Sequence, residues 1–157
     1  MDLLNFSFFQ NALFGSLLTA IACGIVDGMG YGDSARAALL TRGMNEMMRL
    51  SLAMGGKRET LMGMCGLGDL VLTATSMQSR NFSLGHALGQ GQALEDILAS
   101  RNSVTEGVHT ARAVHALAGK QDIDLPVIGA VHAILHEGKS AADAVNGLLS
   151  RPFGDES

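Results

Sequence analysis

Apolar positions recur at helical spacing through most of the chain. Two stripes are clearest, one within residues 35–53 and one near residues 108–117. Their apolar members are Leu40, Met44, Met47, Met48, Val108, Ala111, Val114 and Leu117. An apolar residue at every third or fourth position is typical of an amphipathic helix, and no long stretch shows the strict alternation of a strand. Shorter helices are expected at residues 59–64, 67–73, 81–88, 94–99, from 126 onward, and 141–149.

Local signals mark where several of these helices begin and end. Glycines at 28, 30 and 32 close the first helix, and Asp33 or Ser34 is expected to cap the next one. Pro126 suits a first helical turn, and Ser140 followed by Asp143 resembles a capping box. The pattern as a whole predicts an all-α fold with a single helical domain.

The opening of the chain carries no charged residue from position 3 to position 26. A run of about 20 apolar residues is long enough to cross a bilayer. Polar side chains such as Asn5, Gln10 and Asn11 interrupt this run, however, and the first basic residue is Arg36. We therefore expect a buried helix behind a ragged terminus. The alternatives to a buried helix are a membrane or export segment and a truncated or frameshifted reading frame.

Composition narrows the class of protein. The chain has 157 residues, 47% of them hydrophobic, which excludes intrinsic disorder. A net charge of −4 argues against a nucleic-acid partner, and two cysteines are too few for a disulfide framework. These values fit a cytoplasmic protein in which a membrane segment is not expected. The length is also too short for a dinucleotide domain of about 150 residues together with a substrate domain.

Residues 66–81 combine groups that suit a small polyol phosphate. Asp69 follows a glycine turn, hydroxyl residues come next, and Arg80 and Asn81 end the segment. Arginine binds phosphate bidentately, and a carboxylate accepts a hydrogen bond from a substrate hydroxyl. On spacing alone, a helix cap at Asp69 and a surface arginine at Arg80 explain these residues equally well.

Three further features of the sequence bear on cofactor or metal chemistry. Glu106 precedes a predicted helix, where it either stabilises the helix start or bonds a cofactor. The glycines at 28–32 lack a preceding strand and the G-x-G-x-x-G spacing of a nucleotide loop. His132 and His136 share a helix face, but the sequence indicates no third ligand, so no metal site is expected.

Four segments together closely resemble the C-terminal, substrate-binding domain of NAD(P)-dependent glycerol-3-phosphate dehydrogenase, in order and in spacing. They are residues 22–33, 66–76, 79–81 and 104–107. The resemblance divides the chain into a divergent apolar segment at 1–19, the domain at 20–150 and a tail at 151–157. It implies the all-helical fold shared with the C-terminal domain of 6-phosphogluconate dehydrogenase. It also implies hydride exchange between glycerol 3-phosphate and dihydroxyacetone phosphate with NAD or NADP, a step that supplies glycerophospholipid synthesis.

The resemblance also assigns individual residues. Asp69 matches a substrate-site aspartate, Thr73 a hydroxyl near the substrate, and Ser79, Arg80 and Asn81 a phosphate-binding trio. The residues matching the family's cofactor contacts are Arg80, Val104 and Glu106.

One position departs from the family pattern. A gapless match places Ser16 where the family has its catalytic lysine, and the first lysine of this chain is Lys57. A missing general base costs about 10²–10⁴ in rate. We therefore expect the chain alone to lack dehydrogenase activity and to need a separate dinucleotide-binding domain, or to associate with itself. The alternative is a non-catalytic helical module for binding or oligomerisation.

Overall fold

The chain forms helices throughout the part that its computed structural model describes, residues 3–101 and 106–152, with side chains from Leu13 onward. The described elements are α1 (Leu3–Gly28), α2 (Asp33–Ala53), α3 (Arg58–Leu61), the π-helical turn η1 (Met64–Gly68), α4 (Asp69–Ala74), α5 (Arg80–Gly89), α6 (Leu94–Ala99), α7 (Glu106–Gln121), α8 (Pro126–His136) and α9 (Ala141–Leu149). No strand occurs in these ranges, which confirms the expected all-α fold.

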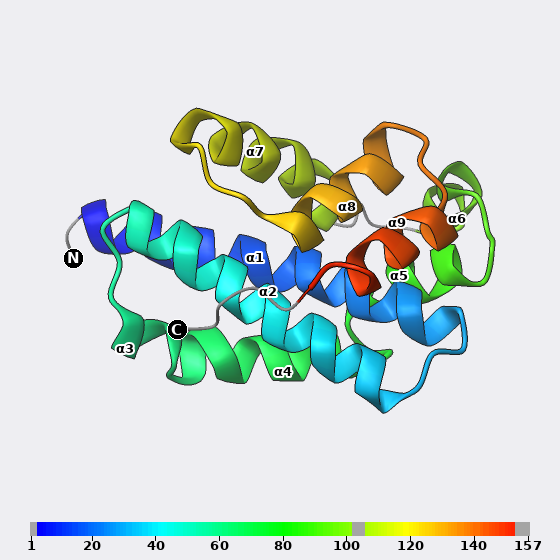
Figure 1. Cartoon of the computed structure of the whole chain (residues 1–157), viewed down its shortest axis with the longest axis horizontal. Coiled ribbons are helices and arrows are strands. Elements are labelled where there is room, and N and C mark those ends of the chain that lie inside the picture. The colour runs from blue at the N-terminus through cyan, green and yellow to red at the C-terminus, as the bar shows by residue number, and fades with distance from the viewer. Residues whose placement is uncertain (1–2, 102–105, 153–157) are drawn as a thin grey trace.

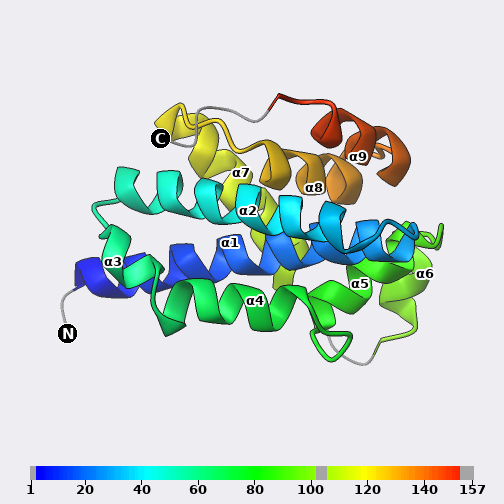
Figure 2. The ribbon, with the colours of Figure 1, turned by 60° about the horizontal axis from the view of Figure 1, so that its bottom comes forward.

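Helix α1 is the central element, around which the others are arranged. It contacts α2, α4, α5, α7 and α8. Figure 1 shows it crossing the middle of the molecule, and Figure 2 shows α2 on one side of it with α4 and α5 on the other. Every residue from 15 to 26 is buried, which confirms the expectation of a buried helix. Among the described residues, no helix is both long and apolar enough to cross a bilayer.

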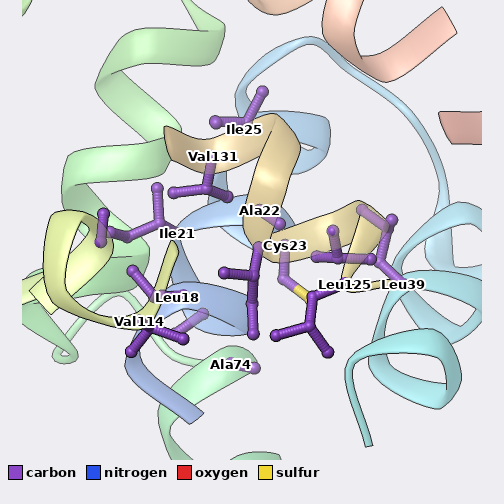
Figure 3. Packing of buried hydrophobic residues seen from close by; sticks show 14 of the residues in the cluster. Leu18, Ile21, Ala22, Cys23, Ile25, Leu39, Ala74, Val114, Leu125 and Val131 are labelled. Carbon is purple, nitrogen blue, oxygen red and sulfur yellow. The ribbon is translucent and has the colours of Figure 1, made fainter. Parts of the chain in front are cut away.

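The core consists of α1 side chains packed against four neighbouring helices. Leu18, Ile21 and Cys23 are fully buried, and Figure 3 shows them among side chains from α2, α4, α7 and α8. The partners labelled there include Leu39, Ala74, Val114 and Val131. Burial raises the pKa of the Cys23 thiol to about 12, so this cysteine is a small core residue and not a nucleophile at neutral pH.

Helices α1 and α5 approach each other so closely that their backbones touch. A Cβ at Gly24 would overlap the carbonyl oxygen of Phe82, and one at Gly28 would overlap that of His86. The relation is reciprocal, because a Cβ at Gly85 would overlap the carbonyl oxygen of Ile21. Each helix thus presents glycines four residues apart, and side chains there would force the two helices apart.

The turn between α1 and α2 differs in one detail from the sequence prediction. Gly32, and not Asp33 or Ser34, is the N-cap of α2. Asp33 is instead the first helical residue, and its carboxylate pairs with Arg36 at 2.6 Å. Gly30 makes the turn possible, because its φ of 82° lies in the left-handed region. The backbone geometry of this turn, and not side-chain capping preference, therefore determines which residue is the N-cap of α2.

A buried carboxylate from α2 caps helix α8. Glu46 is 1% exposed, and its two oxygens accept hydrogen bonds from the backbone N–H groups of Val127 (2.6 Å) and Ile128 (3.1 Å). These N–H groups have no partner inside the helix, so the carboxylate satisfies them from a distant element. Burial raises the pKa of Glu46 to about 7, opposed by these two hydrogen bonds and by nearby Arg49.

At the other predicted cap, Ser140 Oγ accepts a hydrogen bond from the backbone N–H of Asp143 at 3.1 Å. Ser140 is thus the N-cap of α9, as the sequence predicts.

The close approach of α1 and α5 predicts a large cost for Gly85→Ala. Its new Cβ would meet backbone atoms, which cannot rotate away, so we expect a loss of at least about 1–3 kcal/mol in the free energy of unfolding. Gly119→Ala in α7 is the matched control, because nothing lies within 4 Å of its Cβ position. That variant should be neutral or stabilised by up to about 1 kcal/mol. Urea denaturation measures both, and equal stabilities would contradict the close approach.

The raised pKa of Glu46 predicts a stability that falls as pH rises from about 4.5 to about 7. In this window the folded state holds a proton that the unfolded chain has lost, so raising the pH favours unfolding, by a total of about 3 kcal/mol from this group. Urea denaturation at several pH values should show this slope in the native chain and a flatter one in Glu46→Gln. Glu59→Gln, at an exposed position on α3, is the control and should keep the native slope. Parallel curves for the native chain and Glu46→Gln would exclude a raised pKa.

Candidate functional site

Three of the residues singled out from the sequence meet where α1 faces α4. Ser16 Oγ donates a hydrogen bond to Asp69 Oδ2 at 2.9 Å and lies 3.0 Å from Thr73 Oγ1. Ser16 is 1% exposed, whereas Asp69 and Thr73 are half-buried. The position that the resemblance gives to a lysine is thus in direct contact with the predicted substrate-site aspartate.

The Ser16 hydroxyl has one proton and donates it to Asp69, because a carboxylate only accepts. The Thr73 hydroxyl donates to the backbone carbonyl oxygen of Asp69 at 2.8 Å. The 3.0 Å contact between the two hydroxyl oxygens shares one of these protons. The cluster holds the Asp69 side chain in one orientation, and Asp69 supplies its one carboxyl group.

The π-helical turn η1 delivers Asp69 to this position. Gly66 within η1 lies so close to the preceding helix that a Cβ there would overlap the carbonyl oxygen of Leu61. Asp69 then begins α4 directly, with Gly68 as the N-cap. Asp69 is not itself the cap, so the simplest alternative explanation of this residue from the sequence does not apply.

The predicted phosphate-binding trio lies at the start of α5, but its members have different surroundings. Ser79 is the N-cap and accepts a hydrogen bond from the backbone N–H of Phe82. Asn81 is buried, and its Oδ1 accepts from the backbone N–H of Gly107 at 3.2 Å. Arg80 is exposed, and Arg101 donates to its carbonyl oxygen at 3.0 Å.

The hydrogen bond from Gly107 to Asn81 joins the start of α5 to the start of α7. Glu106 is the first residue of α7 and is exposed. Two of the predicted cofactor contacts, Arg80 and Glu106, therefore each lie one residue from this bond. The third, Val104, lies outside the described residues.

The predicted residues thus form two groups. The first is Ser16 with Asp69 and Thr73, between α1 and α4. The second is Ser79–Asn81 with Glu106, between α5 and α7.

A groove of about 530 Å³ lies elsewhere, between α7, α8 and α9, and no predicted site residue lines it. Arg101 supports the second group but was missed from the sequence, because it stands in no motif that would have marked it. Gly107 lies in the segment 104–107 that carries the family resemblance, but no role was predicted for it.

Comparison with known proteins identifies the family of the chain. A family model described as the C-terminus of NAD-dependent glycerol-3-phosphate dehydrogenase matches residues 16–146. The chain belongs to this family. The resemblance seen in the sequence is thereby confirmed, while the domain boundaries after residues 19 and 150 and the roles of the individual site residues stay predictions.

Individual relatives of this glycerol-3-phosphate dehydrogenase family are close in sequence. A glycerol-3-phosphate dehydrogenase [NAD(P)+] of Rhodospirillum rubrum is 59% identical over 134 residues, which are 85% of this chain and 38% of the relative. One from Parvibaculum lavamentivorans is also 59% identical, over 87% of this chain and 41% of its own length. The chain therefore spans less than half the length of these relatives.

Two solved structures show the same fold. The crystal structure of glycerol-3-phosphate dehydrogenase from Coxiella burnetii has a TM-score of 0.90 and 45% identity, covering 96% of this chain and 45% of that one. The structure of DsGPDH of Dunaliella salina shares the fold with a TM-score of 0.76 at 20% identity, over 90% of this chain and 27% of its own.

The contact between Ser16 and Asp69 predicts energetic coupling between them. Ser16→Ala should cost about 1–2 kcal/mol, because it removes a hydrogen bond to a charged acceptor. In a double-mutant cycle with Asp69→Ala, we expect a coupling energy of about 1 kcal/mol, measured by urea denaturation. The control cycle pairs Asp69→Ala with Ser34→Ala at an exposed position of α2 and should be additive. Additivity in both cycles would mean that the Ser16 contact contributes nothing.

Proposed function

We propose that this chain is the substrate-binding part of an oxidoreductase that interconverts glycerol 3-phosphate and dihydroxyacetone phosphate with NAD or NADP in the cytoplasm. Its product would supply glycerophospholipid synthesis. The observation that carries the proposal is the hydrogen bond between Gly107 and Asn81, in a chain that the family model matches over residues 16–146. This bond holds the residues assigned to substrate phosphate beside a residue assigned to the cofactor.

The start of α5 supports phosphate binding on physical grounds. Backbone N–H groups at a helix N-terminus attract anions, and α5 is ten residues long. Arg80 is an exposed residue that adds a guanidinium, a group suited to bidentate phosphate contact. Ser79 keeps a hydroxyl proton to donate, because in its cap contact with Phe82 its oxygen is the acceptor.

At the other end of the substrate, Asp69 would accept a hydrogen bond from a hydroxyl. Its carboxylate already has a fixed orientation, because Ser16 donates to Oδ2. Thr73 would add a neutral group beside it. A polyol phosphate has both kinds of group, hydroxyls for a carboxylate and a phosphate for a guanidinium.

The residues assigned to the cofactor also fit NAD or NADP in their chemistry. Arg80 provides positive charge for a pyrophosphate, and the exposed carboxylate of Glu106 can accept from an amide or a hydroxyl. Val104 completes the proposed set from the resemblance. Which of the two nucleotides binds is not specified by these groups.

The proposal includes no general base from this chain. Ser16 stands at the position of the family's lysine, and its proton is committed to Asp69. A serine hydroxyl does not deprotonate readily at neutral pH, so Ser16 positions Asp69 and takes no proton from a substrate. We therefore expect binding without hydride transfer from the chain on its own.

A non-catalytic binding or oligomerisation module is the second candidate. It is favoured by apolar side chains exposed around η1 and α4, among them Met64 (86% exposed) and Leu72 (71% exposed). Neighbouring exposed residues are Met62, Val71 and Met77. An apolar patch of this kind is typical of a surface that another protein part covers. That part would be a separate dinucleotide-binding domain or a second copy of the chain.

Calorimetric titration with glycerol 3-phosphate distinguishes the two candidates. Substrate binding predicts a millimolar or tighter dissociation constant that weakens by about 10-fold or more in Arg80→Ala, through loss of a charge-assisted hydrogen bond. Arg112→Ala, an exposed arginine on α7, is the control and should bind like the native chain. No binding by the native chain, or equal binding by Arg80→Ala, would reject the substrate role and favour the module.

A further inference from the structure

Three potential metal ligands converge where α7 passes the C-terminal end of α8. They are His115 on α7, His132 on α8 and Glu137, the residue that caps α8. One ligand atom from each lies within 4.8 Å of the others. The sequence showed two histidines on one face of α8 but no third ligand nearby, because His115 is separated from them along the chain and is brought close by the packing of α7 on α8.

His132 is the most informative member of this group. Its Nδ1 atom is buried and has no hydrogen-bond partner among the described residues. The nearest carboxylate oxygen, Glu137 Oε1, lies 3.3 Å away but outside hydrogen-bond geometry. A buried polar atom without a partner costs free energy, and a ligand at this point would remove that cost.

The protonation of His132 also suits a metal ligand. Burial, followed by electrostatic interaction with the His115 side chain, lowers the pKa of His132 below its usual value, although Glu137 opposes the shift. The neutral imidazole is therefore favoured at pH 7, and this is the form that binds metals.

The geometry of the free site differs from that of a loaded one in a defined way. The rings of His115 and His132 are stacked, with centroids 3.9 Å apart and planes within 7°. A metal lies in the plane of each ring that binds it, and ligand atoms around tetrahedral zinc are about 3.3 Å apart. Binding thus requires His115 to rotate out of the stack. His115 is exposed, so this rotation meets little resistance.

We infer that His115, His132 and Glu137 form a binding site for Zn²⁺ or a similar borderline transition metal. Two imidazoles and one carboxylate are a ligand set that zinc accepts, whereas Mg²⁺ and Ca²⁺ prefer oxygen ligands. His136 stays outside the set, because its Nε2 contacts the carbonyl oxygen of Val108 at 2.8 Å. Three protein ligands leave a fourth position for water or an anion. His115 also lines the groove between α7, α8 and α9, which Lys139 and Arg151 line as well.

Competition with a chromophoric zinc chelator at neutral pH tests this site in the full chain. We expect one Zn²⁺ per chain with a micromolar or tighter dissociation constant and no competition by Mg²⁺. His115→Ala and Glu137→Gln should each weaken binding by about 10-fold or more, because each removes one of three ligands. Both residues are exposed, so neither change should unfold the chain, and circular dichroism checks this.

His109→Ala is the matched control, since His109 is an exposed histidine on the same helix α7. It should bind zinc like the native chain, as should Cys65→Ser at the exposed cysteine. Bound zinc should also raise the melting temperature of the native chain and of both controls. Failure of the native chain to bind Zn²⁺, or native-like binding by His115→Ala and Glu137→Gln, would overturn the inference.

Discussion

The backbone contact between α1 and α5 is the constraint on which the rest of the structure depends. Each helix has glycines at the contact, and carbonyl oxygens of the facing helix lie against them. A side chain at these glycines would prevent so close an approach. Because α1 also contacts α2, α4, α7 and α8, its position against α5 sets theirs. The start of α5, with Ser79 to Asn81, is thereby fixed relative to α4 and to α7. Both groups of candidate site residues thus depend on one helix crossing.

Burial of residues 15–26 of α1 on every side explains the composition of this stretch. Each residue from 15 to 26 is covered, so a charge there would need a partner inside the protein. Ser16 is the position where such a partner exists, because Asp69 lies against it. A serine satisfies the carboxylate with a hydrogen bond and introduces no second charge. The absence of charge from residue 15 to residue 26 and the departure from the family pattern at position 16 are thus aspects of the same packing.

The helices could be predicted from the sequence because each depends on local pattern, as α6 (Leu94–Ala99) and α9 (Ala141–Leu149) show with the expected bounds. For the contact of Ser16 with Asp69, the only signal in the sequence was the family resemblance, which assigned both residues to the site. Interactions between distant elements could not be predicted. Glu46 caps a helix about 80 residues away, and Gly32 caps α2 in preference to two better capping residues. Such features depend on how helices pack, which no local pattern records.

The charges of the two groups of site residues, one at α4 and one at the start of α5, indicate how the proposed substrate is oriented. Ser16 orients the Asp69 carboxylate with a neutral hydroxyl and brings no second charge to it. A phosphate beside this carboxylate would be repelled, whereas a neutral hydroxyl would be bound. At the start of α5, Arg80 and the helix N-terminus reverse this preference. In the proposed function, the polyol phosphate therefore lies with its hydroxyl groups toward α4 and its phosphate toward α5. A lysine in place of Ser16 would weaken this polarity, so the serine makes the two ends of the site more distinct.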